Sequence, residues 1–452
     1  MAALMKITAV LVLACLFPGR LDASPQENPE LDDLKKTLQN AIELEWSTIP
    51  VYLNAHFSLK DKQGKNKQVS EMMRDILVNE MHHMSLAANI LNAIGGFPVL
   101  NDLSRAPRYP GPLPAGCLPD LTVSLQKMSK DHIENVFMAI ETPECDHAVR
   151  KFHGDLIKAA SQKESNERLQ MSVTPKFPGL QEKCKEEKGT YNPTTIGAIY
   201  IHKILCPMLK LELEGDRKVS IFTKDHSRQV EHPFKVTNLT TAIKAIAYIV
   251  SQGEGGDPCN PFVYSDFRDD DYKKQNKEEP SHYYKFAEIA KGKEVTVQLN
   301  DQDNPACPLN DPDCNYFSPC SAGTCDNAIR FINKPEKPYF NEDAVWNIIP
   351  NPTTGIYPPG SVARKLSDEF NEIYVDLMQC LHDAVNGQPQ KLQRCVVCKM
   401  HQLKEKGDIL VQTPIIPGGD VNASPTYEFF YTEQDKPEEH NQQRLQQQHI
   451  EL

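Results

Sequence analysis

The sequence predicts a mainly α-helical protein built on a four-helix bundle, with long irregular insertions and an additional helical hairpin near the C-terminus. Two observations lead to this fold class. Several segments carry apolar residues at three- and four-residue steps, and the first two of these place carboxylates and a histidine within the apolar stripe. The chain has 452 residues, too many for one ordinary domain, and its 34 prolines predict long irregular connections.

The N-terminus has the features of a secretory signal peptide. Lys6 precedes an apolar run from Ile7 to Phe17, and a small residue, Ala23, stands where a signal peptidase would cut. The run is too short to span a bilayer. Residues 1–23 are therefore predicted to be removed, and the mature chain to be secreted and extracellular. The net charge of the full 452-residue chain, -12, disfavours nucleic acid and anionic membranes as partners.

The first helical hairpin is predicted from residues 30–58 and 69–94. Residues 30–58 form an apolar stripe that includes Glu45, with an interruption expected near Pro50 because proline lacks the N–H that a helix needs. Residues 69–94 continue the pattern and end at Gly95, the first of two consecutive glycines. The two segments are expected to pack against each other.

The remaining bundle, through residue 292, is predicted as helices separated by polar or proline-rich loops. Helices are expected at 121–140, 194–213, 239–250 and 283–289, with a polar surface insertion at 150–190 and an acidic loop at 266–278.

The C-terminal third is predicted to hold an irregular segment, a helical hairpin and a tail. A Cys- and Pro-rich segment with a short strand at 293–300 extends to residue 360, helical periodicity returns over 361–432, and 433–452 is expected to be disordered because it lacks an apolar face.

Cysteine usage agrees with an oxidising compartment. Of 13 cysteines, Cys15 lies in the predicted signal peptide, which leaves twelve, enough for six disulfides. The alternative at Cys395 and Cys398 is a zinc site, but no second pair with that spacing lies at the usual distance. Asn238-Leu-Thr240 and Asn422-Ala-Ser424 have the form of glycosylation acceptors.

The candidate metal ligands are a glutamate and a histidine three residues apart. Glu80 and His83 project from one helical face and are in phase with the apolar stripe, so without a metal a carboxylate would be buried unpaired. Glu45 lies on the inner stripe of the preceding helix, and a second such pair occurs at Glu279 and His282. Carboxylate and imidazole together suit iron or manganese.

Several motifs resemble the ferritin-like domain of the iminophenyl-pyruvate dimer synthase family, and they span most of the mature chain. The resembling segments are 38–53, 80–83, 89–98, 140–143, 195–200, 252–255, 281–286 and 425–429. This resemblance implies a ferritin-like four-helix bundle that holds one or two non-haem iron ions. Members of that family couple oxidised tryptophan-derived imines in bacterial bisindole pathways.

The resemblance implies a set of ligands for this iron. They are Glu45, Glu80, His83, Glu254 and His282, with Glu141 as a candidate carboxylate from a third helix. Two alternatives remain for one position: helical spacing favours Glu279, whereas the motif Gln252-Gly-Glu-Gly favours Glu254. Ala198 occupies a position on the helix from Thr194 where a family ligand could be expected, which would weaken one metal position.

The leading functional hypothesis is a secreted iron-dependent oxidoreductase or coupling enzyme. It would use dioxygen or peroxide on a small aromatic or amino-acid-derived substrate bound inside the bundle. The alternative is a secreted structural, storage or metal-binding protein without turnover, which the signal peptide, the disulfides and Ala198 favour.

Overall fold

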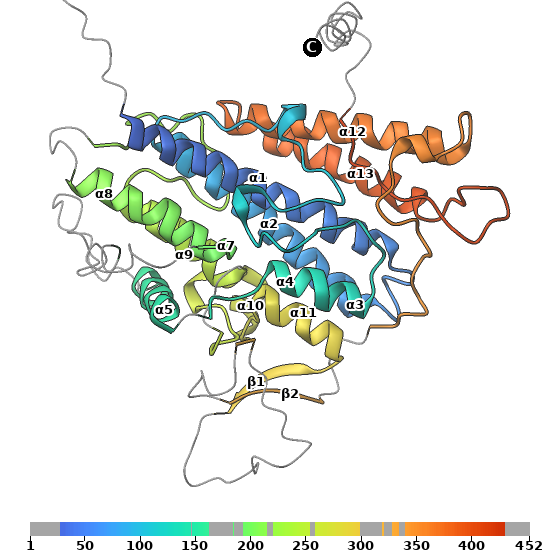
Figure 1. Cartoon of the computed structure of the whole chain (residues 1–452), viewed down its shortest axis with the longest axis horizontal. Helices are drawn as coiled ribbons and strands as arrows, with labels where there is room; N and C mark the ends of the chain where they lie inside the picture. Colours follow the sequence, from blue (N-terminus) through green and yellow to red (C-terminus); the bar gives the residue numbers. More distant parts are fainter. Residues whose placement is uncertain are drawn as a thin grey trace, which may run out of the picture.

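A computed structural model describes most of the helical part of the chain. It covers residues 28–145, 147–161, 184, 193–214, 220–253, 258–298, 319–320, 328–333 and 340–429. These residues are mainly helical, which confirms the predicted fold class (Figure 1). The predicted signal peptide at 1–23 and tail at 433–452 lie outside the described residues.

Two long helices form the centre of the molecule. Helix α1 (Pro29–Ser58) begins with a cap in which the Asn28 side chain accepts a hydrogen bond from Glu30 N at 3.1 Å. Helix α2 spans Lys67–Ala93, and two residues after its end stands Gly95, whose φ of 76° lies in the left-handed region that favours glycine. The two helices run side by side, as predicted (Figure 1).

The interruption expected at Pro50 is absent, because α1 passes through this proline as one helix. Pro50 has no N–H to donate to Trp46 O, four residues earlier. On the same turn, Ser47 O accepts a hydrogen bond from the Tyr109 hydroxyl at 2.6 Å. Pro50 is itself buried, so packing outweighs the penalty of about 3 kcal/mol.

The third helical run is shorter than predicted. It comprises α3 (Lys130–His132), a π-helical segment (Ile133–Phe137) and α4 (Met138–Ile140). Residues 121–129 are not helical, since Val123 pairs with Gly111 through two backbone hydrogen bonds of 2.8 and 3.0 Å. The helix begins where Ser129 Oγ accepts from His132 N.

The prediction of a polar surface insertion at 150–190 is wrong for residues 150–161, which belong to a helix. Helix α5 (His147–Ser161) buries Phe152, Leu156 and Ile157 and packs against α9 (Leu239–Gln252). Leu156 and Ile157 stand four and five residues after Phe152, which gives a narrow apolar stripe in an otherwise polar stretch. The polar residues outnumber this stripe, so the sequence pattern predicted a surface insertion.

The other bundle helices lie close to their predicted positions. The helix predicted at 194–213 forms a continuous helical rod of three parts, α7 (Ile196–Ala198), a π-helical segment (Ile199–Leu205) and α8 (Cys206–Glu214). Helix α11 spans His282–Lys291. The predicted acidic loop contains a short helix, α10 (Asp270–Gln275). Single 3-10 turns occur at Leu103–Arg105, Pro114–Gly116, Ser265–Phe267 and Thr354–Ile356.

A two-stranded antiparallel sheet follows the bundle. Strand β1 (Glu294–Gln298) confirms the predicted strand and pairs with β2 (Ala328–Ile332), so that Glu294 is opposite Ile332. The sheet extends from the end of α11 at the edge of the molecule (Figure 1).

The C-terminal hairpin packs along the side of α1 and α2 opposite α8 and α11 (Figure 1). It consists of α12 (Val362–Val385), a π-helical segment (Leu392–Val396) and α13 (Val397–Leu410). One apolar core joins the hairpin to the bundle. At the junction, Trp46 Nε1 of α1 donates a hydrogen bond to the Tyr374 hydroxyl of α12 at 2.7 Å.

The cysteines are not all paired. Three disulfides join described residues: Cys145–Cys320, Cys184–Cys206 and Cys380–Cys395. Cys117 and Cys398 are free thiols, so the six disulfides allowed by the count do not all form. Because Cys395 bonds to Cys380, it does not form the zinc pair with Cys398. Cys307, Cys314 and Cys325 lie outside the described residues.

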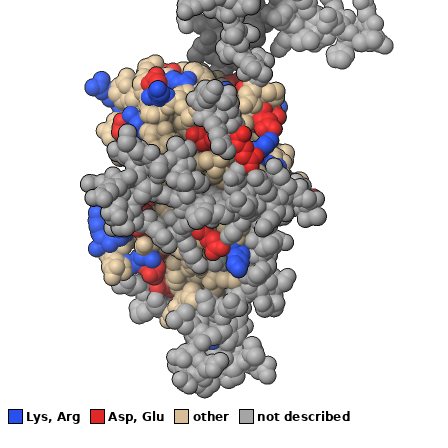
Figure 2. Space-filling model, turned by 90° about the vertical axis from the view of Figure 1, so that its left-hand side faces the viewer, with Lys and Arg blue, Asp and Glu red and all other residues tan. Residues whose placement is uncertain are grey.

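The described surface carries charges of both signs. Acidic and basic side chains are intermixed on the face seen from the left-hand side of Figure 1 (Figure 2). Among the described helices, none is both long enough and apolar enough to cross a bilayer.

Candidate metal centre

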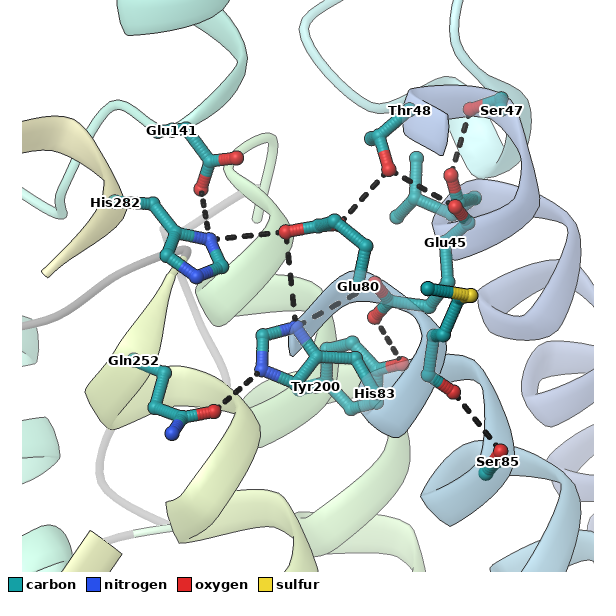
Figure 3. A network of polar contacts seen from close by, with 12 residues as sticks. Glu45, Ser47, Thr48, Glu80, His83, Ser85, Glu141, Tyr200, Gln252 and His282 are labelled. Carbon is teal, nitrogen blue, oxygen red and sulfur yellow. Dashed lines mark hydrogen bonds and ion pairs between the residues drawn. The ribbon is translucent and has the colours of Figure 1, made fainter. Parts of the chain in front are cut away.

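Five buried side chains from four helical elements converge in the middle of the bundle (Figure 3). They form two overlapping groups whose ligand atoms lie within 4.8 Å of one another, namely Glu45, Glu80 and His83, and Glu80, Glu141 and His282. Glu80 belongs to both groups. All five side chains have 0% exposure.

Glu80 Oε1 lies between the imidazole rings of His83 and His282. This oxygen lies 2.9 Å from His282 Nδ1 and 3.9 Å from His83 Nδ1. His83 Nδ1 is 3.8 Å from Glu45 Oε2, and His282 Nδ1 is 3.6 Å from Glu141 Oε2. Each group therefore offers two carboxylates and one imidazole nitrogen around a common point.

One atom of each of the five side chains makes no well-formed hydrogen bond within the described part of the chain. These atoms are Glu45 Oε2, Glu80 Oε1, His83 Nδ1, Glu141 Oε2 and His282 Nδ1. They are the same atoms that face one another in the two groups. Buried polar atoms are normally satisfied, so their convergence is the arrangement expected of metal ligands.

The second oxygen of each carboxylate is held by a hydroxyl group. Tyr200 donates to Glu45 Oε1 at 2.5 Å and Thr48 donates to Glu80 Oε2 at 2.8 Å. Tyr52 donates in the same way to Glu141 Oε1 at 2.6 Å. These three hydrogen bonds fix the rotation of each carboxylate so that its other oxygen points to the centre. Figure 3 shows the hydroxyls of Thr48 and Tyr200 beside Glu80 and Glu45.

The tautomer of His83 is set by Gln252 at the end of α9. His83 Nε2 lies 3.2 Å from Gln252 Oε1, while the amide nitrogen of Gln252 donates to Phe267 O at 2.8 Å. With its nitrogen committed to that carbonyl, Gln252 presents only an acceptor to His83. The proton of His83 is thus placed on Nε2, and the lone pair of Nδ1 faces Glu45 and Glu80.

Local structure explains how these residues reach the centre. Glu80 and His83 lie about one turn apart on α2, and His282 is the first residue of α11. Glu141 is the C-terminal cap of α4, the short helix that follows a π-helical segment. Gly253 closes this side of the site. A Cβ at position 253 would lie 3.1 Å from His282 Nδ1 and 3.2 Å from Glu141 Oε2, so any side chain there would crowd the ligand atoms.

Burial and mutual repulsion set the charges in the centre. Burial, with a contribution from Glu80, raises the pKa of Glu45 well above its ordinary value. Burial and the nearby Glu141 likewise raise the pKa of Glu80. Burial lowers the pKa of His83 well below its usual range. Burial also disfavours the charged form of His282, but Glu141 and Glu80 outweigh this and raise its pKa to about 9.

One residue predicted as a ligand, Glu279, lies in neither of these groups. Glu279 is buried, but its carboxylate pairs with Lys285 Nζ at 2.8 Å and accepts from Asp269 N at 2.7 Å. Since α11 begins only at His282, Glu279 precedes the helix, and the helical spacing that favoured it does not apply. Glu254 lies outside the described residues. His82 is in neither group.

The supporting residues were largely missed by sequence reasoning. Thr48 and Tyr52 stand three and seven residues after Glu45, so helical spacing carried a signal for both. Tyr200 lies inside a π-helical segment, where the rotation per residue differs from that of an α-helix, and simple periodicity does not place it.

The role of Gln252 can be tested by comparing Gln252→Leu with Gln252→Glu. Both variants lose the amide donor to Phe267 O, but only the glutamate keeps an acceptor for His83 Nε2. We expect Gln252→Leu to weaken Mn²⁺ binding, measured by calorimetry, about 10- to 100-fold relative to Gln252→Glu. Equal affinities in the two variants would show that the acceptor does not orient His83.

Comparison of the sequence with family models identifies the family. A family model described as Ferritin-like matches residues 38–291, more than half of the chain and all five residues of the centre. A ferritin-like protein from Caulobacter vibrioides has a similar structure, with 17% sequence identity and a TM-score of 0.49, and the match covers 88% of this chain and 98% of that chain. No curated protein matches the sequence. The chain belongs to the ferritin-like family.

Proposed function

We propose that this protein binds non-haem iron, with one ion at each of the two groups and Glu80 shared between them. The observation that carries the proposal is the convergence of five buried ligand atoms that lack well-formed hydrogen bonds within the described residues. Three carboxylates and two imidazoles are a hard, mixed oxygen and nitrogen donor set, which suits iron or manganese. Membership of the ferritin-like family supports the same conclusion.

The residues around such a centre have two roles, holding the metal and orienting the ligands. Glu45, Glu80, His83, Glu141 and His282 would hold the metal, and the hydroxyls of Thr48, Tyr52 and Tyr200 with the amide of Gln252 orient them. Bound iron would supply one-electron chemistry with dioxygen or peroxide. The complete burial of all five ligands keeps bulk water away from them.

We further propose that the protein oxidises or couples a small aromatic or amino-acid-derived substrate, and that it does so as a secreted protein. The substrate class rests on the resemblance of its motifs to the iminophenyl-pyruvate dimer synthase family. The disulfides Cys145–Cys320 and Cys380–Cys395 support an oxidising compartment.

One observation favours a second function, a metal-binding protein without turnover. The rod formed by α7 and α8 contributes no carboxylate to either group, and Ala198 is buried there as an apolar residue. Its acidic residues Glu212 and Glu214 lie at the far end of the rod. Without a carboxylate from these helices, fewer anionic ligands would hold the two ions, and the ions would be less strongly bound.

Oxygen consumption separates these two functions. Protein loaded with Fe²⁺ under anaerobic conditions would be mixed with oxygenated buffer and a panel of aromatic amino acids. For the enzyme we expect uptake that continues beyond one equivalent per iron and oxidised or dimeric products by mass spectrometry. A single stoichiometric burst without product would support the passive protein, and Glu80→Ala serves as the metal-deficient control.

Metal binding is expected to weaken as the pH falls. With their pKa values raised, Glu45 and Glu80 hold protons at higher pH than ordinary glutamates do, and His282, with a pKa of about 9, is protonated at neutral pH. The metal must displace these protons, so affinity should drop about tenfold per pH unit for each proton displaced. Calorimetry of Mn²⁺ binding in two buffers with different ionisation enthalpies would measure the proton release. Binding without proton release would contradict this expectation.

A further inference from the structure

We propose that Asn238 carries an N-linked glycan and that Asn422 does not, although both stand in acceptor motifs. The proposal rests on the secretion proposed above and is independent of the metal centre. The structure separates the two asparagines by exposure and by the hydrogen bonds of their side-chain nitrogen.

Asn238 is exposed and its side-chain nitrogen is nearly uncommitted. It caps α9 through its oxygen, since Oδ1 accepts from Thr241 N at 3.0 Å. The nitrogen, Nδ2, makes a contact of 3.3 Å with the neighbouring Thr237 hydroxyl. The atom that caps the helix is therefore different from the atom that would carry a sugar.

The modification is chemically compatible with this cap. A lipid pyrophosphate-linked oligosaccharide would be the donor. Its sugar C1–O bond breaks as the C1–N bond to Asn238 Nδ2 forms, Nδ2 loses one proton, and the lipid pyrophosphate leaves with the bonding electrons. The side-chain oxygen keeps its lone pairs, so the capping bond to Thr241 and the start of α9 are retained.

Asn422 is held inside the fold by the same atom that glycosylation would use. Its Nδ2 donates to Val411 O at 2.8 Å, and the residue is only 9% exposed. The motif's serine, Ser424, has 0% exposure and donates to Asn54 Oδ1 at 2.7 Å. A glycan on Asn422 would have to break these contacts between the C-terminal segment and the rest of the molecule.

The glycan would stand far from the metal centre. Asn238 precedes the first residue of α9 and Gln252 is its last, so the 14 residues of the helix separate them by about 20 Å at 1.5 Å per residue. Loss of the glycan is expected to leave the metal content unchanged. Failure of the iron proposal would likewise leave the glycan in place.

Two variants at Thr240 test the proposal without disturbing the cap. The full chain would be expressed in eukaryotic cells with its own N-terminus, and the product analysed by glycosidase treatment and peptide mass spectrometry. The exposed Thr240 belongs to the acceptor motif but is not the capping residue. Wild type and Thr240→Ser should carry one glycan, and enzymatic release should convert Asn238 to aspartate. Thr240→Ala should carry none and keep the same melting temperature.

Other results would overturn the proposal. An unmodified Asn238 in the purified wild-type chain would do so, whether the protein is recovered from the medium or from the cells. A glycan on Asn422 would do so as well, because it would show that the contacts of its side chain do not exclude the modification.

Discussion

Replacing Glu80 with alanine is expected to remove both metal ions. Glu80 is the residue common to the two groups, and its Oε1 lies 2.9 Å from His282 Nδ1 and 3.9 Å from His83 Nδ1. In contrast, Glu45→Ala and Glu141→Ala each affect a single group, so these variants should lose one ion. Elemental analysis of the metal-to-protein ratio after anaerobic loading with Fe²⁺ and desalting would distinguish two, one and none.

Glu288→Gln is a matched control for these variants. Glu288 is another buried carboxylate, on the same helix as His282, but it accepts a hydrogen bond from Val295 N and is in neither group. We expect this variant to keep full metal content. Glu80→Gln is the shape-conserving alternative if alanine prevents folding. A Glu80→Gln protein that still held two ions per chain would contradict the shared role of this residue.

Replacing Gly407 with valine is expected to lower the free energy of unfolding by more than any other substitution proposed for the C-terminal hairpin. Gly407 lies on α13 where the Phe57 ring of α1 packs against the backbone, and a Cβ at 407 would approach the ring carbons to 2.5–2.8 Å. Phe57 is itself only 1% exposed, so the ring has little room to move. Overpacking of this kind costs about 1–3 kcal/mol. A fall in the free energy of unfolding, measured by urea titration, would report it.

A double variant tests whether the loss of stability comes from the clash between a side chain at position 407 and the Phe57 ring. Phe57→Leu shortens the side chain that faces Gly407, so the combined Gly407→Val and Phe57→Leu variant should lose less stability than the sum of the two single changes. Glu405→Ala, at an exposed position of the same helix, should change stability by less than about 0.5 kcal/mol. Strictly additive effects would mean that the two residues are not in contact.

The sequence was sufficient for the parts of the centre that lie on regular helices. Glu45, Glu80 and His83 are in phase with the apolar residues of α1 and α2, and the structure places all three together. Periodicity works there because each of these helices is long and buries a continuous stripe. Glu141, at the end of a short helix, came from the family resemblance alone. His282, at the start of α11, came from its three-residue spacing to Glu279 and from the resemblance.

Helix boundaries and irregular turns were the main source of error. Helical spacing favoured Glu279, but α11 starts three residues later and leaves that carboxylate to Lys285. The helix predicted from residue 121 starts at 130, because a backbone pairing between Val123 and Gly111 competes with it. Such long-range contacts leave no local pattern in the sequence.

The centre joins distant parts of the chain, because its five candidate ligands extend from Glu45 on α1 to His282 on α11. A metal that binds only the folded protein adds RT ln(1 + [L]/Kd) to its stability, about 2.7 kcal/mol at a hundredfold excess over Kd. For the iron proposed above, local supply would then set how long each molecule survives proteases. Abundance of the protein would follow this supply even if its gene were transcribed at a constant rate.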